Sequence, residues 1–396
     1  MYTHYAPGFS PVVPGDRRRT VWPGHTWMDG GVRPVQRPLA STGLVPGGGQ
    51  RASGAGRADG SDVRAIGGRS ADGRPRFDQF VPQDGYLWWY LDALSDDGQH
   101  GLTFIAFVGS VFSPYYAWDR SRQLTQPDNY CALNVALYSK HAKRWTMTER
   151  GAKHCHRDDS QFTIGPSQLR WDGNALVIDI NEIGVPLPHR VRGQVRVHAD
   201  TWFNFSTSID ALGKHRWGPL APSARVEVNL QYPSQQWTGN AYLDSNEGDE
   251  PIDRSCHEWD WSRSPMKDGS TAVIYDIQGK PGKQDDKLLA LRFKADGTVE
   301  NFQAPNRYSL PPTLWRIQRR MRSESAVQVQ EQLEDTPFYQ RALLKSRLLG
   351  EEVQSFHETL YVPRLVSPVV QAMLPWRMPR RALSTKPFYF NPSLLM

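Results

Sequence analysis

The chain has 396 residues, of which 39% are hydrophobic and 11% aromatic, so it is long and apolar enough for two ordinary domains. Its net charge is +6, and residues 1–76 account for all of it, because they hold eleven arginines, five aspartates and no lysine or glutamate. The rest of the chain sums to about zero, which argues against a nucleic-acid-binding protein.

Residues 1–76 are predicted to form a disordered basic tail. They contain fifteen glycines and little periodic hydrophobicity. No apolar run follows Arg17–Arg19, so neither a secretory nor a twin-arginine signal is predicted. The cysteines, Cys131, Cys155 and Cys256, are too few and too scattered for a disulfide framework, which agrees with a reducing cytoplasm.

Residues 101–118 carry no charge and just reach the length of a membrane-spanning helix. They contain Gly109, Ser110, Ser113 and Pro114, which favour a strand, a turn and a second strand instead. No other segment approaches such a length, so the sequence predicts peripheral membrane contact at most.

An all-β fold is predicted between residues 86 and 304. Short runs rich in β-branched and aromatic residues alternate with turn residues, and Asp-Gly pairs at 172–173, 268–269 and 296–297 are typical of hairpins. So many short strands indicate closed or sandwiched antiparallel sheets. We expect two β domains in tandem, 77–220 and 221–310, with the boundary near residues 210–225.

Residues 311–396 are predicted to be helical. Apolar side chains recur there at helical spacing, namely Leu343, Leu344, Leu348, Leu349 and Phe356. Proline-punctuated apolar segments follow them. This part of the chain either packs across the sheets or lies in a membrane interface through Trp315, Trp376 and its arginines.

Acid groups and aromatic rings are mixed between His215 and Pro251. In an extended strand residues i and i+2 share one face, so His215 lies beside Trp217, and Tyr242 lies beside Asp244. Each pair sets an ionisable group next to an aromatic ring, which suits the chemistry of a cation. The alternative is a pair of edge strands with solvated polar faces.

A metal site is a second possibility, because five histidines and cysteines could supply zinc ligands: His154, Cys155, His156, Cys256 and His257. Neither CxxC nor HExxH spacing is present, and neighbouring residues of a strand point to opposite faces. The sequence therefore predicts no metal centre.

Two acidic clusters remain. Glu258 and Asp260 share a strand face, as the paired carboxylates of a glycosidase would, but such pairs are also common on solvated strands. Glu247, Asp249 and Glu250 form an acidic loop, for which a solvated turn is the preferred interpretation.

Several motifs, in order along the chain, resemble the carotenoid 1,2-hydratase family of phototrophic bacteria. They are GYLWWYLDALSDDGQHGLTFIAFVGSVFSPYYAW, HRWGP, GNAYLDSNEGDEP, CHEWDWSR and LEDTPFYQRALL, and the resemblance covers about residues 80–365. It implies two tandem lipocalin-like β domains. It also implies a cofactor-independent hydro-lyase that adds water across the terminal C1=C2 double bond of acyclic carotenoids such as lycopene and neurosporene.

The family's site pattern falls on His215, Trp217, Tyr242 and Asp244. A carboxyl desolvated by aromatic walls keeps its proton near neutral pH, so Asp244 is expected to protonate C2. Trp217 and Tyr242 would face the cation at C1, and His215 would orient the attacking water and accept its proton. Which of Asp244 and His215 is acid and which is base stays open.

The resemblance implies an acyclic carotenoid and water as the partners, with no metal or organic cofactor. A substrate dissolved in membranes implies peripheral attachment to the cytoplasmic face of the inner photosynthetic membrane. The alternative function is a non-enzymatic, lipocalin-type carotenoid carrier. Ionisable groups at the closed end of the cavity would favour the enzyme, and a wholly apolar end would favour the carrier.

Overall fold

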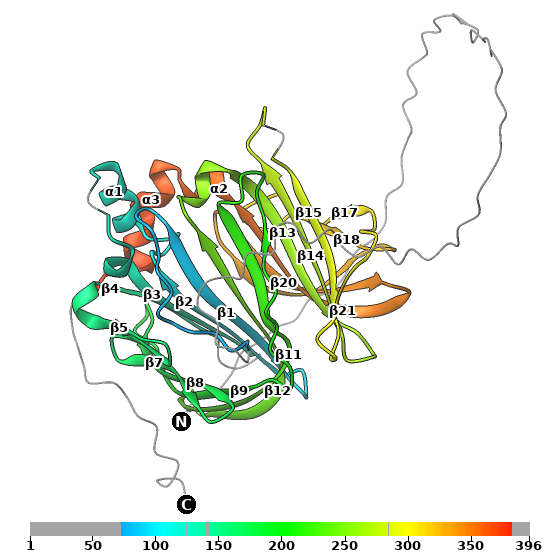
Figure 1. Ribbon diagram of the computed structural model, residues 1–396, viewed down its shortest axis with the longest axis horizontal. Helices are drawn as coiled ribbons and strands as arrows, with labels where there is room; N and C mark the ends of the chain where they lie inside the picture. The colour runs from blue at the N-terminus through cyan, green and yellow to red at the C-terminus, as the bar shows by residue number, and fades with distance from the viewer. Residues whose placement is uncertain (1–72, 124, 140–142, 284, 382–396) are drawn as a thin grey trace, which may run out of the picture. The chain divides into compact units, whose positions relative to one another are not determined.

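The computed structural model describes residues 73–381, apart from 124, 140–142 and 284 (Figure 1). The tail predicted for residues 1–76 lies outside them, except for residues 73–76, and so does the end of the C-terminal segment. The described part of the tail contacts the first sheet, where Arg74 donates to the Gly173 carbonyl at 3.0 Å and the Trp171 indole to the Pro75 carbonyl at 2.9 Å.

The first sheet has twelve antiparallel strands among the described residues. They are β1 (Tyr86–Ser95), β2 (His100–Val108), β3 (Cys131–Ser139), β4 (Arg144–Arg150), β5 (Cys155–Arg157), β6 (Gln161–Ile164), β7 (Ser167–Asp172), β8 (Ala175–Ile183), β9 (Arg190–His198), β10 (Thr207–Ser208), β11 (His215–Tyr232) and β12 (Gln235–Gly248). The order is β4-β3-β2-β1-β12-β11-β9-β8-β7-β6-β5, with β10 beside β11. The sheet curls until β4 contacts β8 and β3 contacts β6, which nearly closes a barrel.

The second sheet has seven strands in the part of the chain that the structure describes. They are β13 (Cys256–Pro265), β14 (Thr271–Gly279), β15 (Lys287–Phe293), β16 (Val299–Asn301), β19 (Gln328–Asp335), β20 (Tyr339–Leu348) and β21 (Glu351–Tyr361), and β17 (Arg307–Ser309) and β18 (Arg320–Arg322) form a separate ribbon. The order is β16-β15-β14-β13-β21-β20-β19. Both sheets confirm the predicted all-β class.

The helices are short: α1 (Pro114–Ser121), α2 (Val362–Leu365), α3 (Pro368–Arg377) and the 3₁₀ turns η1 (Pro127–Tyr130), η2 (Ala152–His154) and η3 (Ile252–Arg254). Figure 1 shows α1, α2 and α3 gathered at one end of the sheets. In place of the second strand predicted within residues 101–118, α1 forms, because Ser113 caps its first turn and Pro114 suits its first position. Within the described ranges, no helix has the length and apolarity that crossing a membrane requires.

The helical structure predicted for residues 311–396 is wrong over residues 314–356, which contribute to β18, β19, β20 and β21 instead. Leu, Gln, Arg, Glu and Lys, all good helix formers, dominate it and produced a misleading 3.6-residue pattern. The burial has period two: Leu344, Ser346 and Leu348 are buried, whereas Lys345 and Arg347 are exposed. Leu349 and Gly350, both with positive φ, make the tight turn between β20 and β21.

The predicted Asp-Gly hairpins are confirmed, since Gly173, Gly269 and Gly297 have φ of 59°, 81° and 86° in the turns after β7, β13 and β15. The domain boundary expected near residue 220 falls inside β11, which pairs with β12 and β9. The two sheets divide between Gly248 and Cys256 instead.

Two cores position the site. Alternate residues of β12, among them Trp237, Ala241 and Leu243, point into the core inside the first sheet. Tyr242 lies on the opposite face, in a second core that the first sheet shares with β13, β14, β15, β20 and β21. The predicted alternation along β12 is therefore confirmed. On the polar face, Tyr242 and Asp244 are covered by the second sheet, whereas Thr238 and Asn240 are exposed.

Buried polar bonds cross between the sheets. Arg263 of β13 donates through Nε and Nη2 to Asp92 of β1, with the Nε contact at 2.9 Å, and both side chains are almost fully buried. Burial raises the pKa of Asp92, and the Arg263 guanidinium partly offsets this rise. An ion pair of this kind is costly to leave half-paired in a low-dielectric interior.

Arg263→Met should therefore lower the free energy of unfolding by about 3–5 kcal/mol, because it strands the Asp92 carboxyl without its cation. Arg225→Met is the matched control, since Arg225 pairs with Asp96 where both side chains are about half exposed, and it should have a much smaller effect. Chemical denaturation of the three proteins measures this. Equal losses in both variants would contradict the importance of the buried pair.

Candidate active site

Asp244 lies on the face of β12 that the second sheet covers. Its backbone pairs with Tyr90 of β1 and Pro219 of β11, and its side chain opens into a small cavity between the sheets. Both sheets contribute to the lining, which consists of Trp88, Tyr90, Trp217, Asp244, Asn246, Trp259, Trp261, Tyr275 and Glu358. The cavity therefore has aromatic walls and two carboxyl groups.

The Asp244 carboxyl is held by neutral donors. Trp217 Nε1 donates to Oδ2 at 2.8 Å, and the Tyr242 hydroxyl donates to the same oxygen at 2.9 Å. Burial raises the pKa of Asp244 to about 8, against the lowering effect of these two hydrogen bonds. At neutral pH this carboxyl is therefore mostly protonated.

The geometry also indicates which oxygen carries the proton. Oδ2 already accepts two hydrogen bonds, whereas Oδ1 has only a long contact of 3.5 Å with Asn246 Nδ2. A proton on Oδ1 leaves both short bonds intact. Asp244 thus presents an O–H group that two fixed donors hold in place from behind.

Trp217 and Tyr242 are themselves fixed by aromatic packing. Trp217 meets Tyr275 edge to face, with ring centroids 5.6 Å apart, and Tyr242 packs on Trp261 at 5.2 Å. Neither Trp217 nor Tyr242 has exposed surface. The structure therefore brings together three of the four side chains that the sequence singled out, Trp217, Tyr242 and Asp244.

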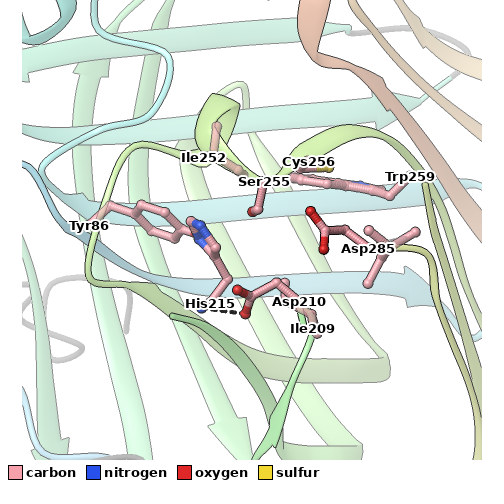
Figure 2. A pocket seen from close by; sticks show the side chains of 10 residues that line it. Tyr86, Ile209, Asp210, His215, Ile252, Ser255, Cys256, Trp259 and Asp285 are labelled. Atoms are coloured by element: carbon pink, nitrogen blue, oxygen red, sulfur yellow. Dashed lines mark hydrogen bonds between the residues drawn. The ribbon is translucent and has the colours of Figure 1, made fainter. Parts of the chain in front are cut away.

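His215 lies in a neighbouring cavity (Figure 2). Its backbone partner is Gly248, four residues along β12 from Asp244, which is roughly 13 Å of strand. Nδ1 is 2.8 Å from the Tyr86 hydroxyl, and the His215 amide donates to Asp210 at 2.8 Å. Burial lowers the pKa of His215, so the ring is neutral at pH 7. Only Trp259 lines both cavities.

The other polar clusters serve local structure. Glu258 and Asp260 are both bound by Arg320, and Asp260 also accepts from Thr359 at 2.6 Å. Burial raises the pKa of Asp260 to about 7. Trp259 and Trp261, which alternate with these acids, line the Asp244 cavity instead.

The acidic loop is neutralised by nearby cations, since Arg216 binds Glu247 and Asp249 and Lys214 binds Glu250 at 2.7 Å. Of the proposed zinc ligands, Cys155 lies on β5 of the first sheet and Cys256 on β13 of the second. Among the residues from 73 to 381 that are described, no group of three or more potential metal ligands comes together.

A larger groove adjoins the Asp244 cavity, and its empty space, including the part open to solvent, is about 1150 Å³. Its walls come from β2, β3, β4, the ends of β19 and β20, and α3, and they include Ile105, Phe112, Trp145, Met147, Phe338, Tyr339, Arg341, Met373 and Leu374. Ile105 is the β2 neighbour of Tyr90, and Arg341 is the β20 neighbour of Glu358. Two pairs of adjacent residues thus form the border between groove and cavity.

Sequence reasoning missed Tyr90 and Glu358. Tyr90 belongs to the quoted motif GYLWWYLDAL, but its strand gave no reason to select one aromatic ring over the others. Glu358 lies within the region predicted to be helical, residues 311–396. A strand pattern at residues 351–361, where His357 and Thr359 alternate with Glu358, was the available signal.

Comparison with known proteins finds relatives that are named as carotenoid hydratases. A family model described as carotenoid hydratase CrtC matches residues 104–387. The acyclic carotenoid 1,2-hydratase of Rubrivivax gelatinosus is 58% identical over 383 residues, which is 95% of this chain and 93% of that protein. The protein of the same name from Thiocapsa roseopersicina is 50% identical over 380 residues, again 95% and 93% of the two chains.

A solved structure is similar in fold alone. It is that of an AttH-type protein, NE1406, from Nitrosomonas europaea, with 14% identity and a TM-score of 0.51 over 69% of this chain and 91% of that one. It supports the β architecture. The division into two tandem lipocalin-like domains stays a prediction.

The raised pKa of Asp244 predicts a pH-dependent stability difference between wild type and Asp244→Asn. The native state holds this proton up to about pH 8, whereas the unfolded chain releases it near pH 4, so ionisation opposes folding between these values. The asparagine does not titrate. Its stability relative to wild type should therefore rise with pH, by at most about 1.4 kcal/mol per unit, and level off above pH 8.

Denaturant unfolding of both proteins at pH 5, 6, 7 and 8.5 measures the difference, and other titrating groups cancel in the comparison. A difference that stays constant over this range would mean that Asp244 is ionised in the folded protein.

Proposed function

The chain belongs to the carotenoid hydratase family, and we propose that it adds water to the terminal C1=C2 double bond of an acyclic carotenoid. The observation that carries the proposal is a buried carboxyl group that receives short hydrogen bonds only from neutral donors in a cavity with aromatic walls, where burial raises its pKa. Hydration of an isolated alkene needs such an acid where bulk water is scarce. The reaction class is that of a hydro-lyase.

Asp244 is the acid of the proposed reaction. Its Oδ1 proton passes to C2, the π electrons form the new C–H bond, and a tertiary cation remains at C1. The hydrogen bonds from Trp217 and Tyr242 then stabilise the carboxylate that is left behind, so they gain strength as the reaction proceeds. Addition of water changes no oxidation state of the molecule as a whole, and we propose that no cofactor takes part.

The aromatic walls suit the cation. Trp88, Trp261 and Tyr275 line the cavity beside the carboxyl. A desolvated cation beside such a ring gains about 2 kcal/mol, and rings that are already packed in place need no reorganisation as the charge develops. In the proposed reaction, water captures the cation at C1 and gives a tertiary 1-hydroxy product.

The groove beside the cavity is the proposed site of the polyene chain of lycopene, neurosporene or a related carotenoid. Its lining is mostly apolar, and it borders the cavity that holds the acid. A carotenoid carrier would need the same groove but no ionisable group at its end. Asp244 and Glu358 in the adjoining cavity therefore favour the enzyme.

We further propose peripheral attachment to the cytoplasmic face of the inner photosynthetic membrane through an exposed apolar surface, here named the α3 surface. It consists of Leu314, Trp315, Val366, Val369, Met373 and Trp376. Val369, Met373 and Trp376 follow i, i+4, i+7 spacing on α3, so they share one face. The segment that holds Leu314 and Trp315 is joined to α2, because Arg364 of α2 donates to the Trp315 carbonyl at 2.6 Å.

Charge and position both fit an anionic lipid surface. Residues 362–381 contain four arginines and no aspartate or glutamate, although Arg380 is paired with Glu149. Trp315, Met373 and Arg377 belong to the groove as well as to this region, so the groove opens beside the α3 surface. A carotenoid could then pass from the lipid into the groove without crossing water.

Asp244→Asn should abolish turnover, by roughly 10²–10⁴-fold or more, since an amide cannot protonate an alkene. Wild-type product formed in D₂O should carry one deuterium at C2 and the hydroxyl at C1. For wild type, kcat/KM should fall as pH rises through about 8, because Asp244 loses its proton there. Mass and NMR analysis of the product locate the label.

Near wild-type turnover in a folded Asp244→Asn protein would exclude this residue as the acid. Oxygen incorporated from O₂ rather than from water would exclude hydration itself.

The double variant Val369→Ser/Trp376→Ser should bind phosphatidylglycerol vesicles at least about tenfold more weakly than wild type, because it removes the two most exposed apolar side chains of α3. Tyr232→Ser is the control, since this exposed aromatic lies at the far end of β11. Vesicle co-sedimentation measures binding, and turnover on detergent-dispersed carotenoid should stay near wild type. Equal binding of all three proteins would remove the α3 surface from the proposal.

A further inference from the structure

The proposed reaction needs a group that accepts a proton from the attacking water, and His215 does not line the cavity of the acid. Glu358 does. It is the other carboxyl group of that cavity, it comes from β21 of the second sheet, and only 8% of it is exposed. Asp244 stands on the first sheet, so the two carboxyl groups belong to opposite walls.

The register confirms that Glu358 faces the cavity. Its direct neighbour on β13 is Trp261, and its direct neighbour on β20 is Arg341. Directly paired residues of antiparallel strands point to the same face of a sheet. Trp261 packs on Tyr242, which is itself bonded to Asp244, so this face is the one turned toward the acid.

Two fixed donors hold the Glu358 carboxylate. The Tyr90 hydroxyl and Arg341 Nε both donate to Oε1, each at 2.7 Å, and neither bonds to Oε2. Tyr90 is the β1 neighbour of Asp244, so one side chain links the strand of the acid to the second carboxyl group. Arg341 is almost fully buried and supplies the positive charge that an ionised Glu358 requires.

On the basis of the proposed function, we propose that Glu358 is the catalytic base, and that Tyr90 and Arg341 are its positioning residues. The water oxygen forms its bond to C1 while one of its O–H bonds breaks, and that proton goes to the Glu358 carboxylate. Asp244 has given its own proton to C2, so the substrate gains one water in total. The proton on Glu358 then returns to Asp244 through water in the shared cavity, which restores both groups.

The two carboxyl groups thereby differ in kind before the substrate arrives. Asp244 receives hydrogen bonds only from neutral groups, whereas Glu358 is bonded to a guanidinium. The negative charge of Glu358 also favours the protonated form of Asp244. One buried acid and one buried base can therefore coexist in a single cavity.

Glu358→Gln tests the assignment, because the amide oxygen can still accept from Tyr90 and Arg341 but the side chain cannot take a proton. Hydration should fall roughly 10²–10⁴-fold. Glu358 exchanges no proton with the substrate when C2 is protonated, so that step remains reversible through Asp244. In D₂O, the recovered unhydrated carotenoid should therefore gain deuterium at C2, although little alcohol forms.

Asp244→Asn, assayed in parallel, should show neither hydration nor exchange. Glu182→Gln is the control for altering a buried Arg–Glu pair, since Glu182 binds Arg150 at 3.1 Å in the first sheet, away from the cavity. It should keep both activities. Glu358→Asp retains a carboxylate and should hydrate the carotenoid at least about tenfold faster than Glu358→Gln.

The outcomes separate the two proposals. Two results would overturn the base assignment and leave the proposed function standing. One is hydration by Glu358→Gln at the wild-type rate. The other is a folded Glu358→Gln protein that loses exchange as well as hydration. If Glu358→Gln does not fold, hydration by Glu358→Asp no faster than by Asp244→Asn would equally overturn it. A wild-type protein that neither hydrates nor exchanges acyclic carotenoids would overturn the proposed function itself.

Discussion

Exclusion of bulk water from the space between the two sheets is the constraint on which the site depends. A solvated aspartate would be ionised at neutral pH and could not protonate an alkene. Asp244 keeps its proton because β1, β11 and β12 on one side and β13, β14 and β21 on the other leave it almost no exposed surface. The acidity is therefore a property of the packing of two sheets, and no single strand supplies it.

The buried carboxyl groups named here all have polar partners at this interface, and the type of partner favours either the ionised or the neutral form. Asp92 faces the guanidinium of Arg263, and Glu358 faces that of Arg341. Asp244 meets only an indole N–H, a phenol and an amide. Cations favour the ionised form of a carboxyl group, and desolvation without a cation favours the neutral form. The difference in partners thus favours the neutral form of Asp244 and the ionised form of Glu358.

The sequence predicted what depends on local geometry. Period-two alternation placed Tyr242 beside Asp244, and the Asp-Gly pairs located three hairpins. It did not reveal that Trp217 would donate to Asp244, because that bond joins two strands whose register is shifted by bulges near Pro219 and Ala221. Register between strands depends on the whole sheet and is only weakly encoded in one segment.

Contacts between the sheets were still less accessible. Tyr90 and Glu358 are 268 residues apart in sequence, and their hydrogen bond exists only because the two sheets pack face to face. The error over residues 314–356 had the same origin. Strand pairing and burial overrode the helix propensity of a Leu-, Arg- and Glu-rich segment, and a propensity of a few tenths of a kcal/mol per residue is easily outweighed by packing.

The position of Asp244 on one sheet and Glu358 on the other bears on what either half of the chain could do alone. A chain cut between Gly248 and Cys256 would give two fragments, each with one carboxyl group and half of the aromatic wall. Neither fragment would bury its polar face, since Asp92, Tyr90, Arg263 and Arg341 all find partners across the divide. Loss of either half would thus remove one of the two carboxyl groups of the proposed reaction together with the packing that buries the other.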